Sequence, residues 1–303
     1  MTVVNSPSIT NGDALVISAH AKVNLCLEVL GKREDGLHEV ATVLQTISLA
    51  DRLRFVPGAQ VRLHCPGAPA GPDNLILRAA SLLRERTGSR AGCAIDCVKR
   101  IPVGGGLGGG SADAAATLLA LNEFWSTGLS IEELADLARE LGADVPFFLR
   151  GGTALATGTG TTLHQLPDTP RHWLVLAPIG DPALNKTGSM YGSLTAAGFT
   201  DGTAARRQAT AIAGGELDYD RIGSAFSGPA RERWPATASA ASVLARSSPL
   251  AVAVSGSGPS VFALYSSRAV AIAALHSLRA AGTPGQLHRF VSERRLAEGP
   301  YTC

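Results

Sequence analysis

Six of the seven residues from Gly104 to Gly110 are glycine, and a helix-forming run, residues 111–119, follows at once. Glycine readily adopts positive φ and lets a backbone approach a ligand closely, while a helix N-terminus presents unpaired N–H groups. Alternating residues over 94–101 predict a strand before the glycines. The order of strand, glycine loop and helix predicts a cradle for an anion, and the phosphates of a nucleotide fit it best.

Three other interpretations of this loop are disfavoured. A Walker A loop has a lysine directly before its Ser/Thr, where this chain has Gly110. A dinucleotide fold needs an acidic residue about 20 positions further on, at the end of a second strand, whereas residues 125–128 are leaving a helix. A flexible linker would be rich in polar residues and would adjoin no helix.

Composition limits the class of protein. With 303 residues, 45% hydrophobic content and a net charge of +2, we expect a soluble, two-lobed α/β or α+β protein without a nucleic-acid partner. No apolar stretch has the length of a membrane span, and residues 1–13 show no signal pattern, so we expect a cytoplasmic protein. The five cysteines form no C-x-x-C pair, and neither a disulfide framework nor a metal site is expected.

The first third of the chain reads as mainly β. Residues 1–13 are expected to be frayed, and residues 15–30 to form two short strands or one bent strand, on which Lys22 and Asn24 share a face. Further strands are expected at residues 40–49, 53–56 and 61–64.

Helices are expected after these strands. Residues 74–87 have helical spacing with Gly88 beyond their end, and Ser130 with Glu133 forms a capping box. The helix that follows this box should bury Leu134, Leu137, Ala138 and Leu141. Asp144 should then lie in a connection that is extended before Pro146.

A break at residues 167–170 predicts an N-terminal domain of residues 1–167 and a C-terminal domain of residues 168–303. Within the second domain, residues 191–246 should be mostly helical. A hairpin-like unit, a helix and a last strand should follow, at residues 250–265, 268–281 and 287–291.

Five separated segments together resemble the GHMP kinase superfamily, strongly up to about residue 170 and hardly over residues 185–250. They are Ala21-Lys22-Val23-Asn24-Leu25, Glu34-Asp35-Gly36-Leu37-His38-Glu39, the run 102–115, Leu141-Gly142-Ala143-Asp144-Val145-Pro146-Phe147, and Ser255-Gly256-Ser257-Gly258-Pro259.

The resemblance implies an N-terminal ribosomal-protein-S5-like domain that binds ATP and a C-terminal ferredoxin-like substrate domain. The Lys-x-Asn and Asp-Gly-x-His segments further imply transfer of the γ-phosphate of ATP to the 2-hydroxyl of 4-diphosphocytidyl-2-C-methyl-D-erythritol, in isoprenoid precursor synthesis. The substrate would thus carry a cytidine diphosphate group, Mg²⁺ would arrive with ATP, and the protein would be a monomer or a weak homodimer. A homoserine or mevalonate type of kinase, a non-catalytic nucleotide-binding protein and an RNA-binding module remain alternatives.

The resemblance implies that Asp144 is the catalytic base and that Lys22 pairs with it and faces the transferred phosphoryl group. Considered alone, each would be an ordinary solvated side chain. It implies further that His38 reads the cytosine edge and that Asn24 lies near the erythritol or cytidine part. Members of the family commonly have Tyr before this His, where this chain has Leu37, and Tyr191 is expected to stack on the cytosine.

ATP-binding roles are implied for Lys99, Pro102, Gly104, Gly105, Gly106, Leu107, Gly108, Gly109, Gly110 and Ser111, and substrate-binding roles for Ser255 and Gly256. Lys99 could equally be a charged strand end, and the segment 255–258 a plain hairpin turn.

Overall fold

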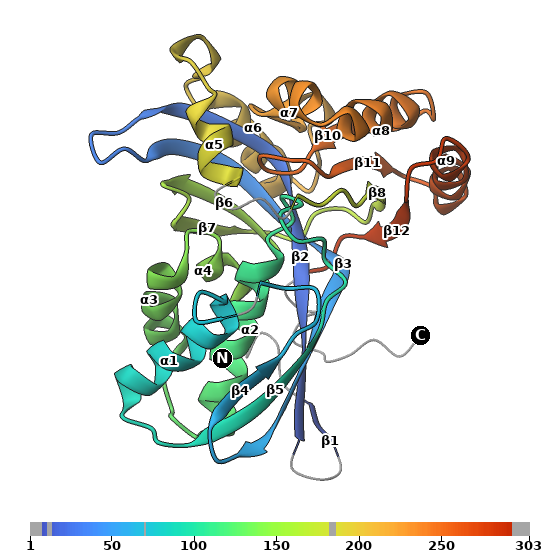
Figure 1. The fold of residues 1–303 in the computed structure, drawn as a ribbon. Coiled ribbons are helices and arrows are strands. Elements are labelled where there is room, and N and C mark those ends of the chain that lie inside the picture. The colour runs from blue at the N-terminus through green and yellow to red at the C-terminus, as the bar shows by residue number, and fades with distance from the viewer. Residues whose placement is uncertain (1–7, 11–13, 70, 182–185, 293–303) are drawn as a thin grey trace.

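The computed structural model describes residues 8–10, 14–69, 71–181 and 186–292. Within this part of the chain, one sheet has eight strands and another has four. The larger sheet runs down the molecule with helices on one side, and the smaller sheet lies beside its upper end (Figure 1). The predicted α+β class is confirmed.

Two long antiparallel strands, β2 (Ala14–Lys32) and β3 (His38–Gly58), form the spine of the larger sheet. Strand β2 takes the bent form that the sequence left open, with register shifts after His20, Asn24 and Val29. The separate strands expected at 40–49 and 53–56 are one strand, because β3 pairs with β2 along nearly its whole length. The other strands of this sheet are β1 (Ser8–Thr10), β4 (Val61–His64), β5 (Gly92–Val98), β6 (Thr153–Gly158), β7 (Thr162–Leu166) and β9 (Gly223–Ser224).

The N-terminal expectation was partly wrong, since Ser8–Thr10 pair with β2. Residues 1–7 and 11–13 lie outside the described residues.

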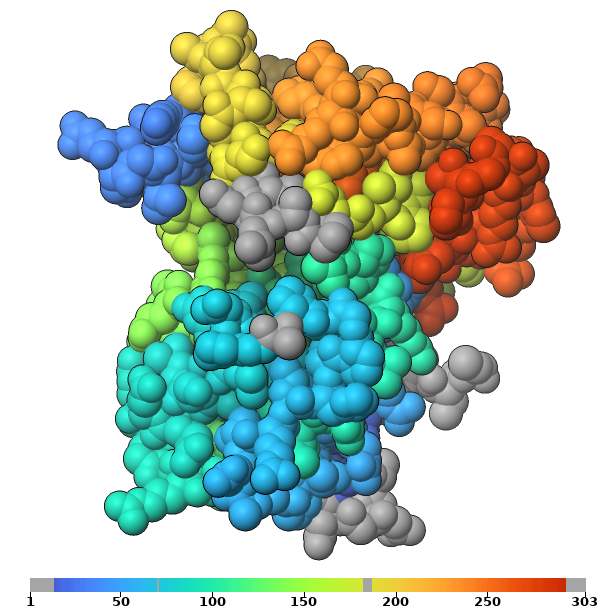
Figure 2. Space-filling model, viewed as in Figure 1, coloured from blue at the N-terminus to red at the C-terminus, as the bar shows by residue number. Residues whose placement is uncertain are grey.

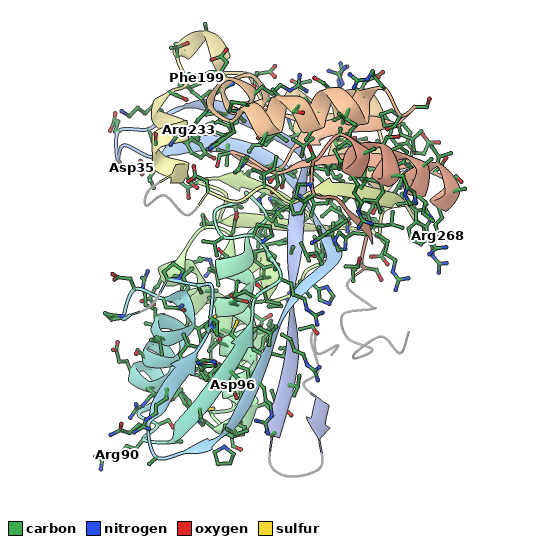
Figure 3. The ribbon with its side chains drawn as sticks, turned by 45° about the vertical axis from the view of Figure 1, so that its right-hand side comes forward. Asp35, Arg90, Asp96, Phe199, Arg233 and Arg268 are labelled. Carbon is green, nitrogen blue, oxygen red and sulfur yellow. The ribbon has the colours of Figure 1, made fainter. Side chains whose placement is uncertain are left out.

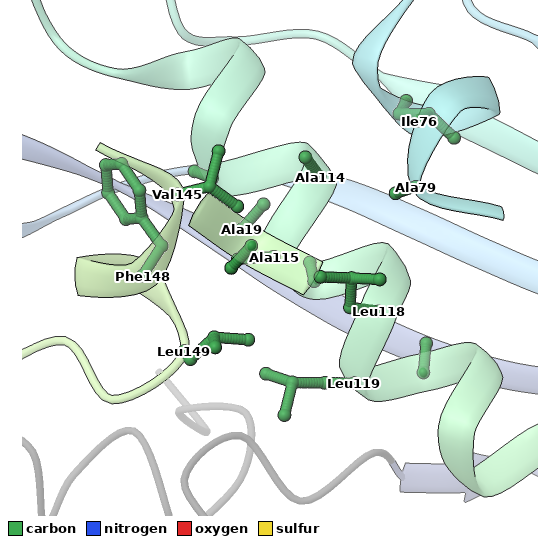
Figure 4. Packing of buried hydrophobic residues seen from close by; sticks show 14 of the residues in the cluster. Ala19, Ile76, Ala79, Ala114, Ala115, Leu118, Leu119, Val145, Phe148 and Leu149 are labelled. Atoms are coloured by element: carbon green, nitrogen blue, oxygen red, sulfur yellow. The ribbon is translucent and has the colours of Figure 1, made fainter. Parts of the chain in front are cut away.

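Four helices, α1 (Leu75–Thr87), α2 (Gly109–Phe124), α3 (Ile131–Leu141) and α4 (Val145–Phe148), cover the larger sheet. Helix α2 is buried from Ala112 to Leu121, because its alanines allow close packing against β2 on one side and α4 on the other (Figure 4). The left-handed Gly88 after α1, the capping box before α3 and the four buried residues of α3 are all confirmed.

The smaller sheet has the order β10-β11-β8-β12, from β8 (Trp173–Ala177), β10 (Ala251–Val254), β11 (Val261–Tyr265) and β12 (Gln286–Arg289). Helices α8 (Pro235–Ala245) and α9 (Arg268–Ala280) pack on it, which confirms the predicted ending. The middle segment is largely helical as predicted, with α5 (Lys186–Gly192), α6 (Thr203–Ala213) and α7 (Ser227–Arg233).

The two sheets share a core. Val23 and Leu25 of β2 lie in one buried cluster with Leu174, Leu176 and Phe262 of the smaller sheet. Strand β9, which comes late in the chain, pairs with β2, and helix α6 packs against β2 and β3. The later half of the chain therefore helps to fix the strand that carries Lys22. The division at residue 167 stays a prediction.

In the part of the chain that the structure describes, no helix combines the length and the apolar character that crossing a membrane requires.

Candidate active site

A cavity of about 1090 Å³ is lined by residues from both halves of the chain. The lining residues 73–75 belong to the lower part of the molecule in Figure 2, and the lining residues of helix α5 belong to its upper part. Helix α2 and the glycine loop, residues 102–110, line one end. The turn between β2 and β3 and helix α5 line the other.

Glycine is sterically required at three positions of the glycine loop. Gly104, Gly106 and Gly108 have φ of +68°, +78° and +72°. A Cβ on Gly104 would lie 1.7 Å from the carbonyl oxygen of Asp181, and one on Gly106 would lie 2.2 Å from that of Ser255. The loop therefore passes closer to neighbouring backbone than any side chain would allow.

Hydrogen bonds hold the loop from both halves of the chain. Its carbonyl oxygens accept bonds from one group of β2 and from three groups of the later half. These are Lys22 N to Leu107 O (3.0 Å), Asp181 N to Val103 O (3.1 Å), Ser260 N to Gly105 O (3.2 Å) and Ser255 Oγ to Gly106 O (2.9 Å).

The first turn of α2 faces the cavity, and Gly109, Gly110 and Ser111 all line it. Helix geometry leaves the N–H groups of this turn without acceptors inside the helix, and the dipole places partial positive charge there. The loop has no Walker-type lysine, but the Cγ of Lys22 would lie 3.2 Å from a Cβ on Gly108. Strand β2 thus supplies a cation beside the loop.

Lys22 and Asp144 form an ion pair in the cavity. Nζ of Lys22 lies 3.8 Å from Oδ2 of Asp144, and the lysine is buried while 42% of the aspartate side chain is exposed. Burial lowers the pKa of Lys22, and Asp144 partly offsets this effect by favouring the charged form.

Asp144 lies in the connection between α3 and α4, as predicted, but the expected extended backbone there was wrong. Its φ of −81° and ψ of −17° are helical, and it is the N-cap of α4. Pro146 lies in the first turn of this helix, where a proline costs no hydrogen bond, so the chain turns where an extended connection was expected.

A buried relay of hydrogen bonds fixes Lys22. Its Nζ donates to Oδ1 of Asn24 (2.6 Å), and Nδ2 of Asn24 donates to the hydroxyl of Thr42 (2.7 Å). That hydroxyl donates in turn to the carbonyl oxygen of Cys26 (2.7 Å). The predicted shared face of Lys22 and Asn24 is therefore confirmed. Thr42 was missed, because its place depends on the pairing of β2 with β3.

Aromatic side chains gather at the other end of the cavity. The rings of His38 and Tyr191 lie 5.1 Å apart between centroids, and those of His38 and Phe199 6.2 Å apart. Tyr191 also packs edge-on against Phe226 at 4.8 Å. Leu37 lines the cavity beside them with 55% of its surface exposed. No motif in the sequence points to Phe199 or Phe226, which come from the segment with the weakest motif signal.

Segment 255–258 is more than a hairpin turn, since it lies against the glycine loop and Lys22. The hydroxyl of Ser255 is directed to the loop carbonyl of Gly106, so its contact is with the loop. Gly256 lines the cavity, and a Cβ there would lie 3.3 Å from both Nζ of Lys22 and Oδ1 of Asn24.

Lys99 is neither a free strand end nor an isolated cation in the cavity. Its Nζ donates to carboxylate oxygens of Asp51 and of Asp113, the latter at 2.6 Å. Asp51 was not predicted, because it lies on β3, 48 residues before Lys99, and belongs to no motif.

Among the described residues, no group of three or more His, Cys, Asp and Glu side chains is placed to hold a metal ion.

Two family models match the chain. The GHMP kinases N terminal domain covers residues 74–152, and the GHMP kinases C terminal domain covers residues 230–283. The first match spans the glycine loop and Asp144, and the second spans the segment that contacts the loop.

Curated relatives are similar over most of the chain. The 4-diphosphocytidyl-2-C-methyl-D-erythritol kinase of Pelotomaculum thermopropionicum is 45% identical, covering 81% of this chain and 87% of the relative. The kinase of the same name from Bacillus cereus (strain B4264) is 40% identical over 82% of this chain and 88% of the relative.

Solved structures show the same architecture. A crystal structure of 4-(cytidine 5'-diphospho)-2C-methyl-D-erythritol kinase superposes with a TM-score of 0.76 at 36% identity, covering 91% of this chain and 98% of that one. A mevalonate kinase of Methanococcus jannaschii matches with a TM-score of 0.69 over 93% of this chain and 100% of that one, but at 14% identity it shares the fold alone. From these matches, the chain is a member of the GHMP kinase family, in its 4-diphosphocytidyl-2-C-methyl-D-erythritol kinase branch.

Proposed function

We propose that this protein transfers the γ-phosphate of ATP to the tertiary 2-hydroxyl of 4-diphosphocytidyl-2-C-methyl-D-erythritol, giving the 2-phosphate and ADP. One observation carries the proposal: the glycine loop, the Lys22–Asp144 pair and the His38–Tyr191 rings line a single cavity. A substrate with an alcohol at one end and a cytosine at the other can contact the Lys22–Asp144 pair and the His38–Tyr191 rings at the same time.

ATP fits the loop end of this cavity. The first-turn amides of α2 and its dipole suit the phosphates, and the steric demand at Gly104, Gly106 and Gly108 fixes the path of the backbone around them. Pro102, Gly105 and Leu107 complete this loop. Mg²⁺ belongs to the proposal as an ion bound to the phosphates of ATP, whose charge it neutralises while it keeps several waters.

The Lys22–Asp144 pair suits phosphoryl transfer to an alcohol. Asp144 accepts the proton of the 2-hydroxyl as that oxygen forms its bond to the γ-phosphorus. The bond from the γ-phosphorus to the bridging oxygen breaks, and ADP leaves with the electron pair. The ammonium of Lys22 donates toward the transferred phosphoryl oxygens, whose negative charge would otherwise repel the attacking oxygen. Asn24 and Thr42 keep that ammonium in place.

The aromatic end suits a cytosine ring. Tyr191 offers a ring face next to the cavity, held against Phe226, and the imidazole of His38 offers a hydrogen-bonding edge beside it. Gly256 leaves room for the erythritol next to Asn24 and Lys22.

The remaining proposals concern the pathway, the cellular compartment, the oligomeric state and the domain division. We propose that the 2-phosphate product serves isoprenoid precursor synthesis in the cytoplasm. The protein itself is proposed to be a monomer or a weak homodimer. The division into domains at residue 167 is likewise proposed.

ADP release by the purified protein with Mg-ATP tests the function. The cytidyl substrate, homoserine and mevalonate are each offered in parallel. Turnover of the cytidyl substrate alone is expected. Turnover of another alcohol would replace the substrate and keep the mechanism, whereas no turnover with any of the three would overturn the proposal.

A further inference from the structure

A buried bridge of three charged side chains lies beneath the glycine loop. The ammonium of Lys99 donates to Asp51 and to Oδ2 of Asp113, at 2.6 Å for the latter. The Asp51 side chain has no exposed surface, and the Asp113 and Lys99 side chains are only 5% and 10% exposed. Solvent-exposed ion pairs contribute little to stability. These three groups are removed from water, so loss of one of them would leave a buried charge without its partner.

The bridge touches the chain on both sides of the loop. Before the loop, Oδ1 of Asp51 accepts the backbone N–H groups of Arg100 and of Ile101, the latter at 2.8 Å. After the loop, Asp113 lies in the second turn of α2, and the bridge draws this helix toward β3 through Lys99. A Cβ on Gly109 would lie 3.5 Å from Nζ of Lys99, so the bridge reaches the loop itself.

We propose that Asp51, Lys99 and Asp113 are positioning residues that hold the entry and the exit of the glycine loop at the separation that nucleotide binding requires. The proposal rests on the proposed function only in taking the loop as the ATP site. Without the bridge, the loop keeps its bonds to the later half of the chain, but its two ends are no longer fixed to β3. The bound nucleotide must then order them, and affinity falls.

The bridge also carries a titratable group. Burial raises the pKa of Asp113 to about 7, while Lys99 opposes the rise and the negative Asp51 adds to it. Oδ1 of Asp113 has no hydrogen-bond partner within the described residues, so a proton there leaves the bond to Lys99 intact. Cys97 and Cys65 also face this carboxylate, and both thiols have raised pKa values because of burial. Near neutral pH, the charge of the bridge therefore changes at Asp113.

The first test is Asp51→Asn, with ADP binding followed by calorimetry in the presence of Mg²⁺. Loss of the charged acceptor should weaken ADP binding by roughly tenfold or more. In turnover assays the KM for ATP should rise similarly. The KM for the cytidyl substrate and kcat should stay within about twofold, because Lys22 and Asp144 are held by contacts that do not include Asp51.

The matched control is Asp96→Asn. This half-exposed aspartate also lies next to β3, on the open face of the sheet, where it meets Arg54 at 3.8 Å (Figure 3). Its replacement should leave ADP binding unchanged. Unchanged ADP binding in Asp51→Asn, or an equal loss of affinity for both substrates, would overturn the proposal. Failure of the wild-type protein to bind ADP at all would instead count against the proposed function.

The second test follows the pH dependence of nucleotide binding. As pH rises from 6 to 8, Asp113 ionises and its bond to Lys99 becomes a stronger, charge-assisted one, so the bridge should hold the loop more firmly and nucleotide binding by the wild-type protein should tighten. Asp113→Asn keeps an acceptor for Lys99 but cannot ionise. Subtracting its pH profile from that of the wild type removes the titration of the nucleotide itself. A wild-type affinity that rises several-fold relative to that of Asp113→Asn across this range supports the bridge, whereas parallel profiles or a relative fall contradict it.

Discussion

The two ends of the cavity are built in different ways. At the loop end, which we propose binds the phosphates (the phosphate end), the carbonyl oxygens of the glycine loop and the buried ammonium groups of Lys22 and Lys99 are held by short hydrogen bonds. At the aromatic end, the rings of His38, Tyr191 and Phe199 come from three separate segments and meet by ring contacts. His38 follows a turn, residues 33–37, whose side chains are exposed.

This difference suits the separate tasks that we propose for the two ends. Hydrogen-bonded backbone and buried ion pairs tolerate little displacement, as transfer of a phosphoryl group between two positioned oxygens requires. Ring contacts at an exposed turn tolerate substitution, because stacking depends on a flat surface more than on one exact atom. Changes at the phosphate end should therefore abolish chemistry or nucleotide binding, and changes at the aromatic end should alter KM.

Gly108→Val should have the largest effect. The new Cβ would lie 2.6 Å from a ring carbon of Phe148 at a φ of +72°, so the loop must move away from its present path. ADP binding measured by calorimetry should become undetectable while the protein still unfolds in one thermal transition. Gly88→Val, at a φ of +69° in open space after α1, controls for backbone strain alone and should bind ADP normally. Normal affinity in Gly108→Val would exclude this loop as the phosphate site.

Asp144→Asn should lower kcat by roughly 10²-fold or more, the usual scale for a positioned acid or base. The affinity for ATP should change little, because Asp144 lies beyond the loop. Asp136→Asn, an exposed aspartate of α3 paired with Arg139, serves as the control and should keep full turnover. If steady-state rates of Asp144→Asn match the wild type, this carboxylate has no part in proton transfer.

Tyr191→Ala should raise the KM for the cytidyl substrate by roughly tenfold, the scale of one base–aromatic stack, with kcat nearly unchanged. Tyr191→Phe keeps the ring and should behave as the wild type. A loss in Tyr191→Phe equal to that in Tyr191→Ala would show that the hydroxyl, and not the ring face, makes the contact.

Leu37→Tyr should have the smallest effect, a fall in KM of roughly threefold. Leu37 is half-exposed beside His38, and a ring at this position adds a second stacking surface. Leu37→Ala should raise KM slightly, as it removes apolar contact. An increase of KM in Leu37→Tyr would mean that a ring at this position blocks the entrance.

Sequence alone predicted the local structure of the phosphate end well, because the patterns that determine this structure span only a few neighbouring residues. The glycine loop, the helix after it and the shared face of Lys22 and Asn24 follow from spacing along a few residues. The capping box of α3 is of the same kind. Such features depend on backbone rules that neighbouring residues determine.

What sequence did not predict depends on tertiary pairing. Asp51 reaches Lys99 only because β3 lies beside β5, and Thr42 reaches Asn24 only because β3 lies beside β2. The connection at Asp144 was wrongly expected to be extended, because the rule against helix before proline is a preference, which α4 overrides at its first turn. Phe199 lies at the end of a short 3₁₀ turn without periodicity.

The bonds from Asp181, Ser255 and Ser260 to the glycine loop limit how far this enzyme is modular. A chimera that took residues 168–303 from a kinase for another alcohol would also replace three of the hydrogen-bond donors that hold the glycine loop. Acceptor specificity and nucleotide binding are thus inherited together. Exchange of the later half succeeds only where the new segment presents equivalent hydrogen-bond donors to the same carbonyl oxygens.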